Sequence, residues 1–289
     1  MNLRAPSVPL ITIDPYFSIW SNTDRLTDGE TVHWTGEKQP ITGIVFVDEE
    51  PFAFMGRQEG VQALEQTDLS ISACTSRYSF RNDKINLQAE FTSPLLLDDP
   101  DLASRPVSYL RVVTASADDA VHGIRLQITL DDSVCLNKKY QYPTEYQPLS
   151  VPGLTGGRVG AKNQHILNRS GDNLRIDWGY AYLVTNADAD VQSVDYSHPY
   201  GIPAHDLRLT VNGGEALFAF AYDDVRSIRY FGENLPFSCS FLPEKYLLGR
   251  IHRISCPIAT IRMLSLADFL TLESTSRSCI FLRPFFIGR

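Results

Sequence analysis

Apolar and polar residues alternate along most of the first 236 residues. In the stretch 85–91, Ile, Leu, Ala and Phe occupy alternate positions, and Asn, Gln and Glu lie between them. The stretch 124–130 repeats this pattern with Ile and Leu at every second position. Because successive side chains of a strand point to opposite faces, both stretches predict half-buried antiparallel strands.

Other stretches with strand character are separated by clusters of Gly, Pro, Asn and Asp; they are 17–21, 43–47, 69–74, 107–114, 175–186 and 191–196. Residues 207–211 and 216–222 flank Asn212-Gly213-Gly214, which predicts a hairpin with glycines where the turn needs a positive φ. No window before residue 236 repeats apolar residues at helical spacing over three turns. We therefore predict an all-β fold, an antiparallel β-sandwich of supersandwich-like type.

The stretch 143–160 is rich in Pro, Gly and Tyr and is predicted to be a long loop across one end of the sandwich. Its segment Gly156-Gly157-Arg158-Val159-Gly160 has the glycines of a phosphate-binding loop. No Lys-Ser or Lys-Thr pair follows it and no helix is expected there, so a surface loop is the favoured interpretation.

The last part of the chain has a different composition. Residues 237–289 contain seven Lys or Arg against three acids, three of the five cysteines and two of the 18 glycines, and they show neither strand alternation nor a helical face. We divide the chain into an N-terminal segment, 1–60, that packs on the sandwich, the sandwich itself, 61–236, and an irregular, aberrant or truncated tail, 237–289.

The net charge of -8 argues against nucleic acid or an anionic membrane surface as a partner, because both select clustered Lys and Arg. No apolar run approaches the ~18–20 residues that cross a bilayer. The N-terminus also lacks a signal peptide's apolar run of ~7–15 residues. As written, the chain is expected in the cytoplasm. The odd cysteine count without a Cys-x-x-Cys pair predicts reduced, packed thiols.

The six histidines show no His-x-x-x-His or His-Glu-x-x-His spacing, which a helical zinc site would need. His198 and His205 flank 199–201, with Asp195 and Asp206 nearby. A loop could gather these four side chains as metal ligands or around a general base. A polar turn is the interpretation we favour, so no metal site and no cofactor are predicted.

Neighbouring acids occur at Asp98-Asp99 and at Asp223-Asp224. Glycoside hydrolysis uses two carboxyl groups at a controlled separation, but adjacent strand residues point to opposite faces. Solvated loop acids, helix caps or calcium-type ligands are therefore the better interpretation. No Gly-x-Ser-x-Gly segment offers a serine nucleophile, and no residue is assigned a catalytic role.

The three tryptophans, Trp20, Trp34 and Trp178, lie among other aromatic residues. An exposed tryptophan in a cleft stacks on sugar rings, whereas a buried one is a core residue with its indole nitrogen bonded to a carbonyl. We favour the core interpretation.

Several longer motifs occur in order along residues 5–236. The first is Leu-Ile-Thr-Ile-Asp-Pro-Tyr-Phe-Ser-Ile-Trp-Ser at 10–21, followed by Asp-Arg-Leu-Thr at 24–27, His-Trp-Thr-Gly at 33–36 and Phe-Met-Gly at 54–56. Later motifs lie at 91–97, 104–109, 176–182 and 222–232. Together they resemble the N-terminal region of the glutaminase-A-like family.

The resemblance implies a β-sandwich followed by a six-hairpin helical toroid that holds the catalytic carboxylates. After Pro236 the family pattern stops, so no residue of that toroid maps onto this sequence. The shared motifs are interpreted as structural. A less favoured alternative is that the His33 side chain reaches the cleft of such a neighbouring domain. The resemblance also allows for a secreted location, because the family is expected to include secreted members.

The expected function is that of a non-catalytic N-terminal domain of a glutaminase-type amidohydrolase, which converts L-glutamine to L-glutamate and ammonia when complete. The alternative is an accessory or carbohydrate-binding domain of a glycoside-hydrolase-like six-hairpin enzyme, and an interaction domain is a third. The implied partners are the toroid domain and a small-molecule or glycan substrate.

Overall fold

The fold of this chain comes from a computed structural model that describes residues 5–95, 105–151 and 153–235. Within these residues, one antiparallel sheet has, in spatial order, β12 (Thr144–Val151), β13 (Leu154–Ala161), β14 (Tyr180–Thr185), β17 (Glu215–Asp223), β10 (Val107–Ser116), β9 (Ile85–Thr92), β8 (Thr75–Arg81) and β7 (Glu65–Ile71). The expectations for 237–289 and for Asp98-Asp99 fall outside the described residues.

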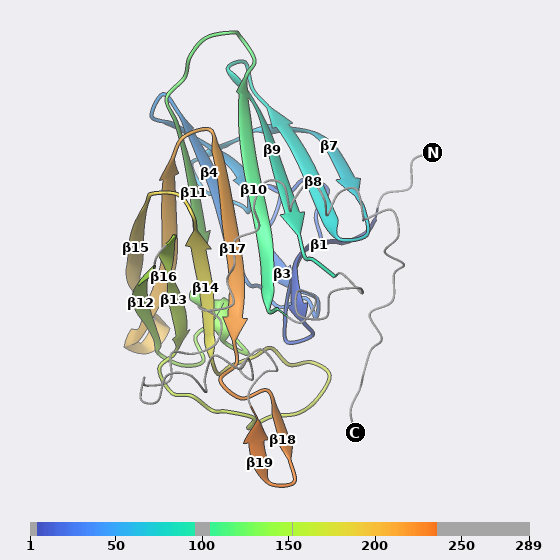
Figure 1. The fold of residues 1–289 in the computed structure, drawn as a ribbon, viewed down its shortest axis with the longest axis vertical. Coiled ribbons are helices and arrows are strands. Elements are labelled where there is room, and N and C mark those ends of the chain that lie inside the picture. Colours follow the sequence, from blue (N-terminus) through green and yellow to red (C-terminus); the bar gives the residue numbers. More distant parts are fainter. Residues whose placement is uncertain (1–4, 96–104, 152, 236–289) are drawn as a thin grey trace.

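The second sheet has the order β15 (Ala189–His198), β16 (Ile202–Asn212), β11 (Ile124–Leu130), β4 (Ile41–Val47), β5 (Glu50–Met55) and β6 (Gln62–Ala63). The pair β5–β6 is parallel, and its other pairs are antiparallel. The two sheets lie as two layers of a sandwich (Figure 1). The prediction of an all-β, antiparallel β-sandwich is confirmed.

Smaller elements surround the two layers. A three-stranded sheet contains β1 (Val8–Asp14), β2 (Phe17–Ser21) and β3 (Val32–His33), and β18 (Ile228–Tyr230) with β19 (Glu233–Leu235) forms a hairpin that projects from one end of the sandwich (Figure 1). The described helices are the short 3-10 turns η1 (Asp132–Cys135) and η2 (Pro199–Gly201). Neither is long enough to span a membrane.

The alternation in the sequence decides which face of each strand is buried. On β11, Leu126, Ile128 and Leu130 are fully buried between the sheets. Arg125, Gln127 and Thr129 take the intervening positions on the outer face. Burying one such aliphatic side chain contributes roughly 2 kcal/mol, so the facing aliphatic residues of the two sheets form the core.

Both strands predicted at 207–222 are present, as β16 and β17, but the predicted hairpin was wrong. The two strands do not pair: β16 lies between β15 and β11 in one sheet, and β17 lies between β14 and β10 in the other. Gly213, with a φ of +122°, therefore lies in a connection between the two layers, which lets each strand bury its apolar face against the opposite sheet.

Two other strands have bounds that differ from the prediction by three or more residues at one or both ends. The expected 69–74 strand begins earlier and ends at Ile71, because the turn closed by the hydrogen bond from Ser72 N to Thr75 O follows it.

The expected strand at 175–186 contains strand structure only from Tyr180 onward. The guanidinium of Arg175 donates to the carbonyl of Asn137 at 2.8 Å, and Ile176 N donates to Tyr16 O at 3.2 Å. These two bonds hold Arg175 and Ile176 outside the sheet, so the strand begins later than predicted. Gly179, with a φ of +84°, precedes the strand.

The stretch 143–160 is not a long loop but the hairpin of β12 and β13, and this prediction was wrong. Gly153 at the turn has a φ of +80°, which favours glycine. A Cβ at Gly157 would lie 2.8 Å from the Tyr146 ring and 2.9 Å from the Leu207 side chain. The glycines that suggested a loop therefore allow close packing within strands, and the phosphate-loop alternative is excluded.

The N-terminal motif has the structural role that its residues predict. The Asp14 carboxylate accepts from Tyr16 N at 2.7 Å and from Phe17 N at 3.0 Å, which forms the turn between β1 and β2. Trp34 Nε1 donates to Pro15 O at 2.6 Å and links the segment after β3 to the same turn. The core interpretation holds for Trp178, whose buried indole donates to Arg226 O at 3.2 Å.

The alternation on β11 leads to a direct test of the core. Ile128→Ala removes a fully buried side chain and is expected to lower the free energy of unfolding by about 2–4 kcal/mol, because it loses transfer free energy and leaves a cavity. Gln127→Ala, on the outer face of the same strand, is the matched control, with an expected change within about 0.5 kcal/mol. Urea unfolding measures both. Equal effects would contradict the assigned faces.

Candidate functional site

A polar cavity of about 280 Å³ lies on the outer face of the six-stranded sheet. Its floor is formed by outward residues of β4, β11 and β16, among them Thr42, Gln127 and Arg208. Their neighbours along each strand are the buried aliphatic residues, so strand periodicity places polar side chains here. Arg57 and Lys139 line the cavity from outside the sheet.

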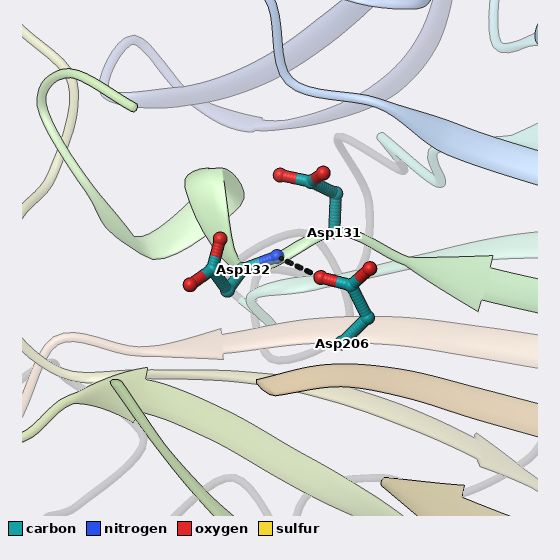
Figure 2. Close-up of side chains that lie close together, drawn as sticks. All are labelled: Asp131, Asp132 and Asp206. Carbon is teal, nitrogen blue, oxygen red and sulfur yellow. Dashed lines mark hydrogen bonds between the residues drawn. The ribbon is translucent and has the colours of Figure 1, made fainter. Parts of the chain in front are cut away.

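Three aspartates lie close together beside this cavity, and two of them, Asp131 and Asp206, line it. Asp131 follows the last residue of β11, Asp132 begins η1, and Asp206 lies on β16. Antiparallel pairing sets Leu130 opposite Leu207, which brings the end of β11 beside Asp206. One oxygen of each carboxyl lies within 4.8 Å of the others, and Asp132 N donates to Asp206 Oδ1 at 3.0 Å (Figure 2).

Asp132 is fully buried, and its carboxyl has three polar neighbours. Thr144 Oγ1 donates to Oδ2 at 2.9 Å, and the His198 Nε2 atom lies 3.2 Å from the same oxygen. The Tyr196 hydroxyl lies 3.2 Å from Asp132 Oδ1 and 3.0 Å from Asp206 Oδ1. A hydroxyl has one proton to donate. A protonated carboxyl would therefore allow both of the Tyr196 contacts to be hydrogen bonds.

Burial and the negative charge of Asp131 both favour the protonated forms. They raise the pKa of Asp132 to about 6 and the pKa of Asp206 to about 7. Burial lowers the pKa of His198, so its ring is neutral at neutral pH. Burial opposes the charge of Lys139, but the attraction of Asp131, 3.2 Å away, raises the Lys139 pKa. Asp206 is therefore partly protonated at neutral pH, and Asp132 takes up its proton in mildly acidic solution.

The hydrogen bonds of the cluster also bear on metal binding. Asp131 Oδ1 accepts from Ser133 N at 2.9 Å, and Asp131 Oδ2 accepts from Lys139. A divalent cation prefers ionised carboxylates and would compete here with the ammonium of Lys139 and with the proton that Asp206 partly retains at neutral pH. The donor set therefore fits a proton-sharing network better than a metal centre.

The structure separates the four side chains near 199–201 that the sequence placed together. His198 contacts Asp132 inside the cluster. His205 instead lies opposite Asp195 on the paired strands β15 and β16, with Nδ1 2.9 Å from Asp195 Oδ1. Ser193 Oγ is 3.4 Å from the same Nδ1 atom. A Ser-His-Asp triad uses both ring nitrogens, so this group lacks that geometry.

The other candidates have structural positions. Asp223 is the last residue of β17; it is buried and accepts from Val225 N at 2.9 Å, so the interpretation as a solvated loop acid was wrong for this residue. Burial raises the pKa of Asp224 to about 6. His33 is fully buried, and burial together with the charge of Arg175 lowers its pKa to about 4. The hypothesis that His33 reaches into a neighbouring domain is not supported, because its side chain is enclosed by its own fold.

Asp131, Asp132 and Lys139 were missed by the sequence reasoning. The available signal was the adjacent pair Asp131-Asp132 directly after the alternating stretch 124–130. The end of a strand lies beside the neighbouring strand of its sheet, so an acid there can meet an acid of that neighbour. Neither the contact with Tyr196 nor the cavity could be read from spacing, because Asp131 and Asp206 are far apart in the sequence. Cys135 is buried as predicted, and neither it nor Cys74 is in a disulfide.

Asp206→Asn is expected to remove part of the pH dependence of stability. The pKa of Asp206 rises from an ordinary 3.8 to about 7 on folding, so the folded chain retains a proton that the unfolded chain releases. This contribution is complete below the unfolded pKa and is lost as the pH rises through the folded pKa. In urea unfolding, the variant should therefore become more stable relative to the wild type by roughly 1–3 kcal/mol between pH 5 and 8.

Asp188→Asn, at an exposed position before β15, is the control for this measurement and should retain the pH profile of the wild type. A difference between Asp206→Asn and the wild type that stays constant across the pH range would contradict the assigned protonation of the cluster.

Two domain families match consecutive parts of the chain. Residues 1–65 match a domain of unknown function, DUF4964, and residues 74–201 match a second, DUF5127. The chain is 28% identical over 191 residues to Glutaminase A of Aspergillus oryzae, an alignment that covers 63% of this chain and 27% of that protein. The chain thus spans well under two thirds of its curated relative.

Two solved structures are distantly similar. A putative kojibiose phosphorylase from the human microbiome aligns with a TM-score of 0.41 and 8% identity over 74% of this chain and 29% of that chain. An inverting mannosidase of family GH92 from Bacteroides thetaiotaomicron aligns with a TM-score of 0.43 and 12% identity over 94% of this chain and 30% of that chain.

The order of the two domain matches and the identity with Glutaminase A agree with the motifs found in the sequence. The sandwich supplies the expected all-β architecture. The chain is therefore similar to the N-terminal β-domain region of the glutaminase-A-like family.

Proposed function

We propose that this chain is the non-catalytic N-terminal β-domain of a glutaminase-type amidohydrolase, which hydrolyses L-glutamine to L-glutamate and ammonia when complete. The observation that carries the proposal is the 28% identity with Glutaminase A over 191 residues, which span 27% of that protein. In this proposal, a helical toroid domain supplies the catalytic carboxylates and is the partner of the sandwich.

The chemistry of the described residues supports a non-catalytic role. Amide hydrolysis needs an activated nucleophile or water, a proton donor and stabilisation of the oxyanion, all held in one sheltered pocket. Asp132 is fully buried, so a substrate does not reach it. Asp206 reaches the cavity, but the described lining contains no serine, cysteine or histidine. Its other two acids, Asp131 and Glu30, are each paired with a lysine.

One end of the sandwich carries aromatic side chains that suit contact with another domain. On the hairpin β18–β19 and the residues that join its strands, Tyr230 is 60% exposed and Phe231 is 91% exposed. Exposed aromatic groups of this size mark interaction surfaces more often than isolated small apolar residues do. In the proposed complete protein, the toroid domain covers this hairpin.

A second candidate is an accessory or carbohydrate-binding domain of a glycoside-hydrolase-like six-hairpin enzyme. The observation that favours it is the partial exposure of two neighbouring aromatic side chains, Trp34 at 44% and Tyr16 at 41%. Aromatic faces stack on sugar rings. Specific binding of this chain to a glycan array would favour this candidate, and ammonia release without glycosidase activity by a full-length relative would favour the first.

The 289-residue chain is expected to show no glutamine-dependent release of ammonia, because it lacks an assembled nucleophile, proton donor and oxyanion site among its described residues. The assay compares it with a full-length relative at equal concentration. Turnover by this chain that is lost in both His33→Ala and Asp223→Asn would contradict the proposal and the structural roles of these two residues. Turnover that survives both substitutions would contradict the non-catalytic role alone.

A further inference from the structure

The cavity on the outer face of the six-stranded sheet contains cationic groups without anionic partners. Arg57 and Arg208 both line it, and neither forms an ion pair with another described residue. Arg208 Nε has one long hydrogen bond, 3.4 Å, to Thr129 Oγ1. The third cation, Lys139, is already bound to Asp131. Two guanidinium groups therefore retain most of their hydrogen-bond donors.

The acceptors in the lining are largely occupied. Both oxygens of Asp131 accept hydrogen bonds from within the cluster. Asp206 Oδ1 accepts from Asp132 N and lies within hydrogen-bonding distance of the Tyr196 hydroxyl. Glu30 forms an ion pair with Lys38. The lining thus presents more unused donors than unused acceptors, which selects a ligand rich in acceptors.

Two amide side chains, Gln58 and Gln127, also line the cavity, and no hydrogen bond to another described residue involves either side chain. Amides both donate and accept, so they can bind hydroxyl groups. Guanidinium groups bind carboxylates through two parallel hydrogen bonds. A ligand that satisfies both kinds of group carries one carboxylate and several hydroxyls.

The acids of the lining limit the charge of the ligand. Asp131 is paired with Lys139 and Glu30 with Lys38, so among the described lining residues Asp206 is the acid without a cationic partner. Its negative charge repels a dianion more strongly than a monoanion. Burial raises the pKa of Asp206 to about 7, so this acid repels an anion less than a fully ionised one would. The cavity volume of about 280 Å³ is near the lower end of small-molecule sites, ~300–1,000 Å³.

We propose that this cavity binds a small hydroxylated monocarboxylate of the sugar-acid class, with Arg57 and Arg208 at the carboxylate and with Gln58 and Gln127 at the hydroxyls. The inference does not depend on the proposed function, because it rests on the lining of the cavity alone. Asp131 and Lys139 form an ion pair, so together they add no net charge to the site.

Isothermal titration calorimetry on the full 289-residue chain tests this proposal with three probes. D-gluconate carries the carboxylate and the hydroxyls, D-glucitol has the same carbon skeleton without the carboxylate, and inorganic phosphate is an anion without the hydroxylated carbon chain. Gluconate is expected to bind about tenfold more tightly than either other probe. Glucitol lacks the charged hydrogen bonds to the guanidinium groups. Phosphate carries a second negative charge, which the lining acid repels.

Arg57→Gln and Arg208→Gln should each weaken gluconate binding by about tenfold, since each removes one charged donor group. Arg229→Gln, on the exposed hairpin β18–β19, is the control and should leave binding unchanged. Circular dichroism confirms that each variant is folded.

The absence of gluconate binding in the millimolar range would overturn the proposal, and so would equal binding of glucitol. Tighter binding of phosphate would overturn the assignment to the carboxylate class. Binding that is unchanged in either Arg57→Gln or Arg208→Gln would overturn the two-arginine site.

Discussion

Burial of one face of every central strand is the constraint on which this structure depends. Leu126, Ile128 and Leu130 of β11 point between the sheets and are fully buried. Because the side-chain period of a strand is two residues, a slip of one residue would move these side chains to solvent and bring Arg125, Gln127 and Thr129 into the core. The register of β11 against β4 and β16 is therefore fixed by the apolar face, and the outer face follows from it.

The polar outer face is a consequence of this register. Once Leu207 and Leu209 of β16 point inward, Asp206 and Arg208 must point outward, beside Gln127 and Thr129 of β11. The chain after β11 then turns over the end of the sheet as η1 and covers Asp132 completely. Burial, together with the nearby negative charge of Asp131, raises the pKa values of Asp132 and Asp206.

The polar features of the sandwich serve different purposes. The network around Asp132 joins η1, β12, β15 and β16 through Thr144, Tyr196 and His198, and it is closed to solvent at its centre. The cavity beside it is open and keeps unused donors. A buried hydrogen-bonded network of this kind fixes the positions of its members, and here it adjoins an open surface with unused donors.

The sequence by itself determined the fold class and most strands of this chain, because alternation with a period of two is a local property that needs no knowledge of partners. It also determined the turn at Asp14, whose hydrogen bonds reach only two and three residues ahead. It failed at 143–160, where glycines usually typical of loops instead allow β13 to pack closely against Tyr146 and Leu207. Only the tertiary structure decided that Asp131, Asp132 and Asp206 meet, since their proximity depends on the pairing of β11 with β16. The separation of His198 from His205 had the same cause: antiparallel pairing of β15 with β16 sets His205 opposite Asp195, whereas His198 lies at the end of β15, against η1.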